Sequence, residues 1–257
     1  MNVIALQSGS NGNCVYVESG EVRLLFDAGI SGRQAELRLR QHGREIRDVR
    51  ALLISHDHRD HARAMGIYQR KYGLPIVVTE KTLAAARRCG ELGVMGDVRH
   101  FESGSTLRFG RVRVETIRTP HDGIDGVAFV VDDGRRRVGI LTDLGHVFSG
   151  LEDLVRSLDA VLLESNYDPH MLAAGPYPEM LKQRIRGPRG HLSNQQCAAV
   201  LHRACARRRR LRWACLAHLS EQNNHPQVAL DTHRAVLGRH LPLCVAKRYG
   251  TTAVLEV

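Results

Sequence analysis

Residues 54–66 read ISHDHRDHARAMG, and this stretch decides how the rest of the chain is interpreted. Positions 56–61 hold three histidines and two aspartates, and the apolar run 51–54 precedes them. Histidine is the commonest nitrogen ligand for zinc-like metals, and aspartate supplies oxygen. A structural zinc finger would spread its ligands over a longer loop and use cysteines, and none of the six cysteines lies near this stretch. So dense a cluster raises the possibility of two metal ions.

The spacing within the cluster indicates how it would divide. If the chain stays extended past Ile54, residues 56, 58 and 60 point to one side, because side chains alternate along a strand. His56 and His58 would then hold one metal, with Asp60 passing beside it. His61 would start a helix and turn back toward the same region. A chance cluster of surface histidines is the competing interpretation, and five ligand-type residues in six positions argue against it.

Length and composition set the outer limits. The 257 residues are 43% hydrophobic and 25% charged, values that are ordinary for a soluble globular protein. No run of eighteen apolar residues occurs, and residues 1–13 lack the basic region of a signal peptide, so no membrane association is expected. The cysteines form no CxxC pair and suggest reduced thiols in the cytoplasm. No protein partner can be inferred from the sequence.

The charge is more informative than the composition. The formal net charge is +10 and the sequence pI is about 9.8, with three arginine clusters. A solvated surface explains any one cluster, whereas the overall excess favours a polyanionic partner such as nucleic acid, since arginine binds phosphate bidentately. Aromatic residues make up only 5%, which leaves little stacking surface for single strands. The clusters are Arg135, Arg136 and Arg137; Arg184, Arg186 and Arg189; and residues 207–210 followed by Arg212.

Hydrophobic patterning predicts an α/β fold. Strands are expected at 3–7, 14–19, 23–29, 49–55, 76–79, 98–103, 111–119, 126–133, 136–144, 160–166, 211–220 and 243–257. Helices are expected at 31–41, 61–72, 80–89, 150–157, 179–185, 193–208 and 226–239, with a loop at 167–178. Two strand-rich halves, each with helices, predict a four-layer αββα sandwich, with two mixed sheets face to face and helices outside. Without repeats or linkers, residues 1–257 are expected to form a single domain.

The string His56-x-His58-x-Asp60-His61 after a hydrophobic strand resembles the signature motif of the metallo-β-lactamase fold superfamily, whose architecture is this same sandwich. Four further residues, Asp27, His121, Asp143 and His218, match later motifs of the family. Each alone could be a turn residue, a cap or a core histidine, but all four lie at strand ends in the family's order. The resemblance implies that Asp27 in LLFDAG braces the metal loop, His121 in RTPHDG binds the first metal, Asp143 in GILTDLG bridges both metals, and His218 in CLAHLS binds the second.

The implied ligand set predicts hydrolysis by two divalent ions. The first ion would be held by His56, His58 and His121, and the second by Asp60, His61 and His218, with Asp143 shared. Two cations about 3.5–4 Å apart share a water, lower its pKa and neutralise charge on the attacked group. Such ligands suit zinc, manganese and iron alike. The histidines that match no motif are expected on the surface: His42, His100, His146, His170, His202, His225, His233 and His240.

Departures from other branches of the superfamily narrow the substrate class. Several antibiotic-degrading lactamases carry cysteine at the position of Asp143, and flavodiiron oxidoreductases carry glutamate at that of His58. The aspartate and the histidine found here therefore argue against both classes. The segment GPRGHLSNQQCAA, 187–199, resembles the His-x-Ser segment of the phosphodiesterase branch, in which the histidine contacts the scissile phosphate. His191 is therefore a predicted catalytic residue together with Asp60. Because His191 and His218 both precede Leu-Ser, their roles as phosphate contact and metal ligand could be exchanged.

The combination of SGSNGN, ISHDHRDH, GHLSN and LAHLSEQNN resembles the YycJ/WalJ group, which is regarded as DNA-acting exonucleases. Ser193 and Asn194 could contact phosphate, although capping of the following helix explains them as well. We therefore predict a dinuclear metal-dependent phosphodiesterase, a nuclease acting on DNA in the manner of a 5′–3′ exonuclease. Two alternatives stay open: a hydrolase of a small cyclic phosphodiester, thioester or lactone, and a non-catalytic nucleic-acid-binding module with structural metals.

Overall fold

The computed structural model describes residues 1–206 and 211–257, so the arginines at 207–210 lie outside the described residues. The chain divides into two compact units. The first unit contains residues 1–118, 123–127 and 247–256, and the second contains 119–122, 128–246 and 257. Each ligand-type residue predicted above belongs to one of these units.

The first sheet has seven strands in the order β14-β1-β2-β3-β4-β5-β6. Its first three strands form an antiparallel meander, and β3 to β6 run parallel. The parallel strand β4 is fully buried, as its continuous apolar sequence predicts. The strands are β1 Asn2–Gln7, β2 Cys14–Ser19, β3 Val22–Phe26, β4 Ala51–Leu53, β5 Ile76–Val78, β6 Val98–His100 and β14 Leu255–Glu256.

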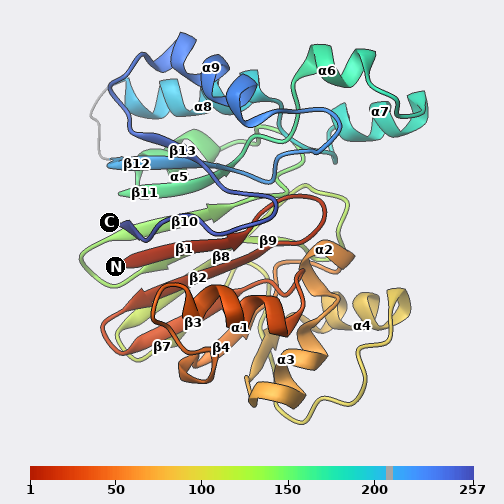
Figure 1. Ribbon diagram of the computed structural model, residues 1–257, viewed down its shortest axis with the longest axis vertical. Helices are drawn as coiled ribbons and strands as arrows, with labels where there is room; N and C mark the ends of the chain where they lie inside the picture. Colours follow the sequence, from red (N-terminus) through yellow and green to blue (C-terminus); the bar gives the residue numbers. More distant parts are fainter. Residues whose placement is uncertain (207–210) are drawn as a thin grey trace. The chain divides into compact units, whose positions relative to one another are not determined.

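Helices connect the parallel strands of this sheet (Figure 1). Ser31 caps α1 and Thr79 caps α4, each by accepting a backbone N–H of the first turn. Tyr68 of α3 is fully buried in the core that these helices share with the sheet. The helical segments are α1 Gly32–Arg40, the 3-10 turn Ile46–Asp48, α2 Arg59–Ala62, α3 Met65–Tyr72 and α4 Glu80–Cys89.

The second sheet has seven strands in the order β13-β12-β11-β10-β9-β8-β7. Strands β10 to β13 run parallel, so each is joined to the next through helices, whereas β9 and β10 form an antiparallel hairpin. The strands are β7 Thr106–Phe109, β8 Val112–Arg118, β9 Val127–Asp132, β10 Arg137–Leu141, β11 Ala160–Glu164, β12 Trp213–Ala217 and β13 Leu243–Val245. The helices are α5 Leu151–Arg156, α6 Pro169–Ala174, α7 Glu179–Arg186, α8 Asn194–Cys205 and α9 Pro226–Leu237.

The predicted α/β class with two mixed sheets is confirmed, but three local predictions were wrong. The helix expected at 61–72 is two helices that begin at Arg59, so Asp60 lies in a helix and not in an extended chain that would place it on one side with His56 and His58. The loop expected at 167–178 contains α6, which Asp168 caps through two backbone N–H groups. The final strand expected from residue 243 is two short strands in different sheets.

One histidine expected on the surface is buried. His233 has no exposed surface, and its Nδ1 donates to the Ala229 carbonyl at 2.7 Å, one helical turn away. Burial lowers the pKa of His233 to about 4, because the charged form loses its hydration. Among the described residues, no helix is both long and apolar enough to cross a membrane.

Candidate metal centre

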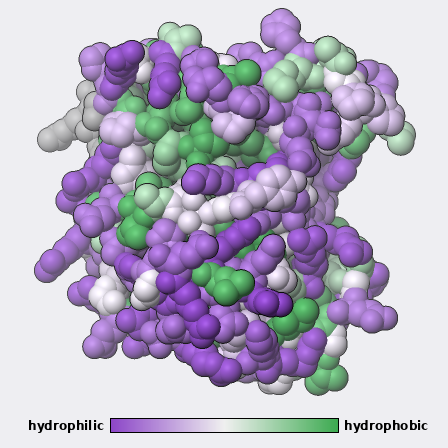
Figure 2. Space-filling model, viewed as in Figure 1, coloured by the Kyte–Doolittle hydropathy of each residue, from purple (hydrophilic) through white to green (hydrophobic). Residues whose placement is uncertain are grey.

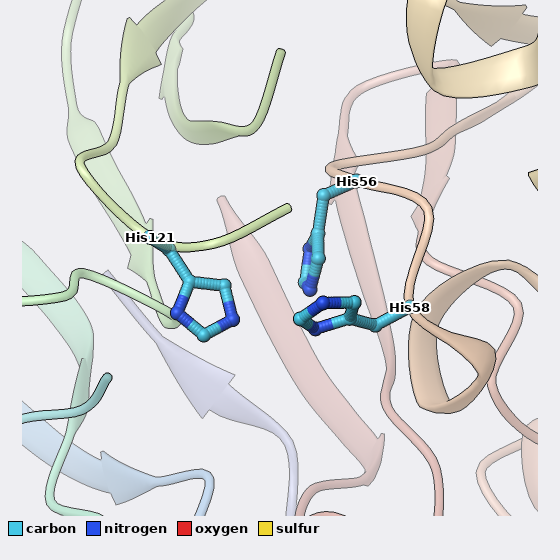
Figure 3. Close-up of side chains that lie close together, drawn as sticks. All are labelled: His56, His58 and His121. Carbon is cyan, nitrogen blue, oxygen red and sulfur yellow. The ribbon is translucent and has the colours of Figure 1, made fainter. Parts of the chain in front are cut away.

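The ligand-type residues of the first unit, called the first ligand set, lie between β4 and the end of α2. They are His56, His58, Asp60 and His61. His56 and His61 are buried, and His58 and Asp60 are half-buried. The ring of His56 lies 4.6 Å from that of His58 and 4.2 Å from that of His61, centroid to centroid. Figure 3 shows the rings of His56 and His58 near each other on this segment. The structure thus brings the histidines of the sequence motif together.

Asp27 holds this segment from the end of β3. Its carboxylate accepts the Ser55 N–H at 2.8 Å and the Ser55 hydroxyl at 2.9 Å. It also accepts Nδ1–H of His61 at 2.7 Å. A hydrogen bond at Nδ1 fixes the ring and makes Nε2 the ligand nitrogen, which is how carboxylates orient metal-binding histidines. Asp27 therefore fixes the position of Ser55 and the orientation of the His61 ring.

The turn between β1 and β2 supports the same segment, and the sequence interpretation did not assign it this role. The Asn13 backbone N–H donates to the Asp60 carbonyl at 2.7 Å, and its side-chain amide lies 2.9 Å from Nε2 of His61. A Cβ atom at Gly29 would lie 1.7 Å from the Asp60 carbonyl oxygen, so no other residue fits at this position. The residues Gly-Ser-Asn-Gly predict a turn between the first two strands, but their spacing carries no signal for these contacts.

The second ligand set lies in the other unit and consists of His121, Asp143, His191 and His218, with Glu164 beside them. Asp143 follows β10, Glu164 ends β11, and His218 follows β12, so three of these residues meet at the carboxyl edge of parallel strands. Ligand-type atoms of Asp143, Glu164, His191 and His218 all lie within 4.8 Å of one another. His191 precedes α8, and His121 lies in the segment between β8 and β9.

Asp143 is central to the second set. Its Oδ1 lies 3.6 Å from Nε2 of His121, 3.6 Å from Nδ1 of His191 and 3.5 Å from Nδ1 of His218. Nδ1 of His121 donates to the Gly190 carbonyl at 2.8 Å, so Nε2 is the nitrogen presented toward Asp143. Oδ1 of Asp143 therefore lies within 3.6 Å of a nitrogen of each of the three histidines.

Glu164 is the functional candidate that the sequence interpretation missed. It is fully buried, and its Oε1 lies 2.7 Å from Nδ1 of His191, while Oε2 accepts the backbone N–H groups of Leu144 and Leu192. Burial alone would raise the pKa of Glu164, but the charge of His191 and hydrogen bonds from His191 and His218 lower it. A glutamate ending the otherwise apolar run AVLLE was the available signal, since a buried carboxylate needs a partner.

The residues after His191 have structural contacts. Ser193 caps α8 in a capping box: its hydroxyl accepts the Gln196 N–H, and the Gln196 side chain accepts the Ser193 N–H. Asn194 is buried, and its Oδ1 accepts the Ser165 hydroxyl at 2.6 Å and the Asn224 amide at 2.9 Å. Contact of Ser193 or Asn194 with phosphate stays a prediction.

Both sets fit divalent ions by their chemistry. The clustered donors are imidazole nitrogens and carboxylate oxygens, which suit zinc, manganese and iron. His61 and His121 each have Nδ1 engaged by an acceptor, so Nε2 is the nitrogen with a lone pair, which in His61 accepts the Asn13 amide at 2.9 Å in this structure. No cysteine of the described residues belongs to these clusters. The donor chemistry therefore supports a catalytic rather than a finger-type site.

The chain resembles known proteins along most of its length. A family model described as the beta-lactamase superfamily domain matches residues 22–211. Exodeoxyribonuclease WalJ of Streptococcus pneumoniae is 37% identical over 228 residues, covering 87% of this chain and 83% of that protein. Exodeoxyribonuclease YycJ of Bacillus anthracis is 33% identical over 229 residues, covering 87% and 84%. The crystal structure of the metallo-beta-lactamase fold protein YhfI from Bacillus subtilis aligns with a TM-score of 0.75 over 99% of both chains at 16% identity, a likeness of fold alone.

Proposed function

Because the chain belongs to the metallo-β-lactamase superfamily, we propose that it is a metal-dependent hydrolase that cleaves phosphodiesters in DNA as an exodeoxyribonuclease. The relatives at 33–37% identity carry that name. The observation that carries the proposal is the pair of Glu164 and His191 beside Asp143, because it adds a proton donor to a set of metal ligands.

Two divalent ions are part of the proposal, with zinc and manganese as the first candidates and iron as a third. His56, His58 and His121 would hold one ion, Asp60, His61 and His218 the other, with Asp143 shared. When bound, the ions lower the pKa of a water and neutralise the charge of the phosphate. The contacts of Asp27 with His61 and of Gly190 with His121 support a ligand role for both rings, since Nδ1–H donates in each and Nε2 carries the lone pair.

His191 acts on the phosphate in this proposal. Glu164 accepts Nδ1–H of His191, which fixes the orientation of the ring. Nε2 then donates a hydrogen bond to a phosphate oxygen, or a proton to the leaving oxygen, where negative charge grows during hydrolysis. A positioned donor of this kind contributes about 10²–10⁴-fold in rate.

Two observations favour DNA over a small thioester or lactone. The net charge of +10 favours a polyanionic substrate. A histidine positioned by a buried glutamate serves a phosphodiester, whose leaving alkoxide needs a proton more than the thiolate of a thioester does. A lactone also leaves as an alkoxide, so against a lactone the argument is the charge alone. A non-catalytic binding module has no use for such a pair.

End-labelled DNA with Mn²⁺ or Zn²⁺ tests the activity. Single-stranded and duplex substrates should shorten from an end, whereas a thioester and a lactone should not react. Asp60→Ala should lose most of the activity and reduce the metal content. Intact DNA under every metal condition, with hydrolysis of the thioester, would replace the nuclease by the small-substrate alternative.

The roles of His191 and His218 are separated by metal analysis of their alanine variants. His191→Ala should keep both metals and the fold while kcat for DNA falls by about 100-fold or more. His218→Ala should lose metal, because its ring is buried and lies 3.5 Å from Asp143. Loss of metal in His191→Ala with full occupancy in His218→Ala would exchange the two roles.

A further inference from the structure

One of the three arginine clusters is attached to the second ligand set through the backbone. The loop 187–190 joins α7 to His191, and the carbonyl of Arg189 accepts the N–H of Asp122, next to His121, at 3.1 Å. The following carbonyl, that of Gly190, accepts Nδ1–H of His121. A Cβ at Gly190 would lie 2.1 Å from the Ile185 carbonyl oxygen, so this backbone is tightly packed. The position of Arg189 relative to His191 is therefore fixed.

The side chains of this cluster differ in what they contact. Arg184 donates from Nε to the Asp122 carboxylate at 2.6 Å, and Arg186 pairs with Glu179 of its own helix. Arg189 is exposed, and its guanidinium forms no hydrogen bond or ion pair with any residue that the structure describes. Arg189 is thus an exposed cation two positions before the proposed proton donor.

The cluster at 135–137 lies elsewhere in the same unit. It begins β10, whereas Asp143 follows the other end of that strand. Arg136 pairs with Asp159 at 3.4 Å, and the Asp133 carboxylate accepts the backbone N–H groups of Arg135 and Arg136. Arg135 itself is exposed and makes no side-chain contact of this kind with the described residues. Arg135 therefore matches Arg189 in charge and exposure but not in location.

We propose that Arg189 binds the backbone phosphate adjacent to the one that is hydrolysed, so that the site prefers a polynucleotide to a small diester. This inference rests on the proposed function. Two residues span at most about 7 Å of extended backbone, so the Cα atoms of Arg189 and His191 lie within about that distance, and the long arginine side chain can reach a phosphate one nucleotide step from His191. A guanidinium binds two phosphate oxygens at once, which suits an exposed site that must compete with water.

Kinetics on two substrates test this assignment, with Arg135→Ala as the matched control. We expect Arg189→Ala to lower kcat/KM for a DNA oligonucleotide about 10-fold more than kcat/KM for bis-p-nitrophenyl phosphate, which has no neighbouring phosphate. The loss on DNA should be mainly in KM. Arg135→Ala should leave the ratio of the two values unchanged. In fluorescence anisotropy with labelled DNA, the log–log salt slope should fall by about 1 for Arg189→Ala only.

If Arg189→Ala and Arg135→Ala have the same ratio of kcat/KM for DNA to kcat/KM for the small diester, and the same salt slope, the inference is overturned. The proposed function would stand, since the wild type would still cleave DNA. If the wild type cleaves neither substrate, the proposed function fails, and the salt slope alone decides the phosphate contact. In that case a reduced slope for Arg189→Ala supports the contact, and an unchanged slope overturns it.

Discussion

Asp27, Asp143 and His218 share a left-handed backbone conformation that residues other than glycine rarely adopt, with φ of 65°, 57° and 55°. Each directly or closely follows a strand, β3, β10 or β12, and the left-handed turn redirects the chain there. This conformation costs an L-residue about 1–2 kcal/mol and persists only where surrounding contacts impose it. Three of the four non-glycine residues with positive φ among the described residues belong to the motif, so the strain is concentrated at the candidate site.

Substitutions at Asp27 separate strain from hydrogen bonding. Asp27→Asn keeps a residue that tolerates positive φ and loses only part of the bonding to Ser55 and His61. Asp27→Gly removes the bonds without strain, and Asp27→Ala removes them and adds strain. We expect unfolding free energies in urea to fall in the order wild type, Asn, Gly, Ala, with a loss of about 2–4 kcal/mol for Ala. An alanine variant as stable as the glycine variant would show that φ at this position is not strained.

Glu164→Gln tests the pair with His191. Glutamine keeps the volume and can still accept a backbone N–H of Leu144 or Leu192, but it loses the negative charge that lies against Nδ1 of His191. We expect kcat for DNA to fall about 10–100-fold with unchanged metal content. Asp159→Asn, at the opposite end of β11, is the buried-acid control and should leave kcat unchanged. Loss of metal in Glu164→Gln would make Glu164 a ligand instead of a positioning residue.

For single residues, the sequence predicted that the histidines of 56–61 lie close together, but not which side chains orient them. The densely spaced histidines of residues 56–61 and the strand-end position of Asp143 were visible as pattern and resemblance. The contacts of Asn13 with His61 and of Glu164 with His191 join residues far apart in the chain. Such contacts depend on how strands are ordered in the sheets, which local spacing does not encode.

Among the elements, the break between α2 and α3 shows why periodicity misplaced a helix. The backbone N–H of Ala64 donates to the carbonyl of Ala28 at 3.0 Å, so a tertiary bond replaces a helical one. Beyond the break, a Cβ at Gly66 would lie 1.9 Å from the Leu92 carbonyl oxygen, so α3 is held close to that segment. The apolar spacing of 61–72 predicted helical structure correctly and could not reveal either contact.

The cap of α8 gives a prediction for Ser193. Its hydroxyl satisfies the N–H of Gln196, an otherwise unpaired donor of the first turn. Ser193→Ala should lower the free energy of unfolding by about 1 kcal/mol, and Ser193→Thr should retain most of it. KM for DNA should stay unchanged in both variants. An alanine variant with wild-type stability and a raised KM would assign Ser193 to the substrate instead.

For the whole molecule, the long-range pairing of the last residues was beyond sequence analysis. The segment from 243 onward supplies β13 beside β12 and then β14, which pairs antiparallel with β1 through Val3 and Leu255. The surface followed from composition more directly: hydrophilic residues cover much of the face shown in Figure 2, as a charged fraction of 25% predicts. Burial alternates along β8, as the alternation of basic and apolar residues at the start of RVRVETI, 111–117, predicts.

Two groups outside the candidate site set the acid sensitivity of the molecule. Burial opposes ionisation of Glu18, but hydrogen bonds from Arg44, Asn2 and Tyr16 lower its pKa to about 2. Burial lowers the pKa of His233 to about 4. In the unfolded chain these pKa values are about 4.3 and 6.5, so the unfolded state binds more protons at intermediate pH for both groups. The native state therefore loses stability as the pH falls.

We expect this loss in two stages when metal-free protein is unfolded in urea at a series of pH values. The contribution of His233 is complete above pH 6.5 and is lost as the pH falls toward about 4, amounting to at most about 3 kcal/mol. That of Glu18 is complete above about pH 4.3 and is lost as the pH falls toward about 2. His233→Leu should flatten the upper stage and Glu18→Gln the lower one, whereas His170→Gln, at an exposed position, should change neither. An unchanged slope between pH 6.5 and 4 in His233→Leu would contradict the lowered pKa of His233 in the folded protein.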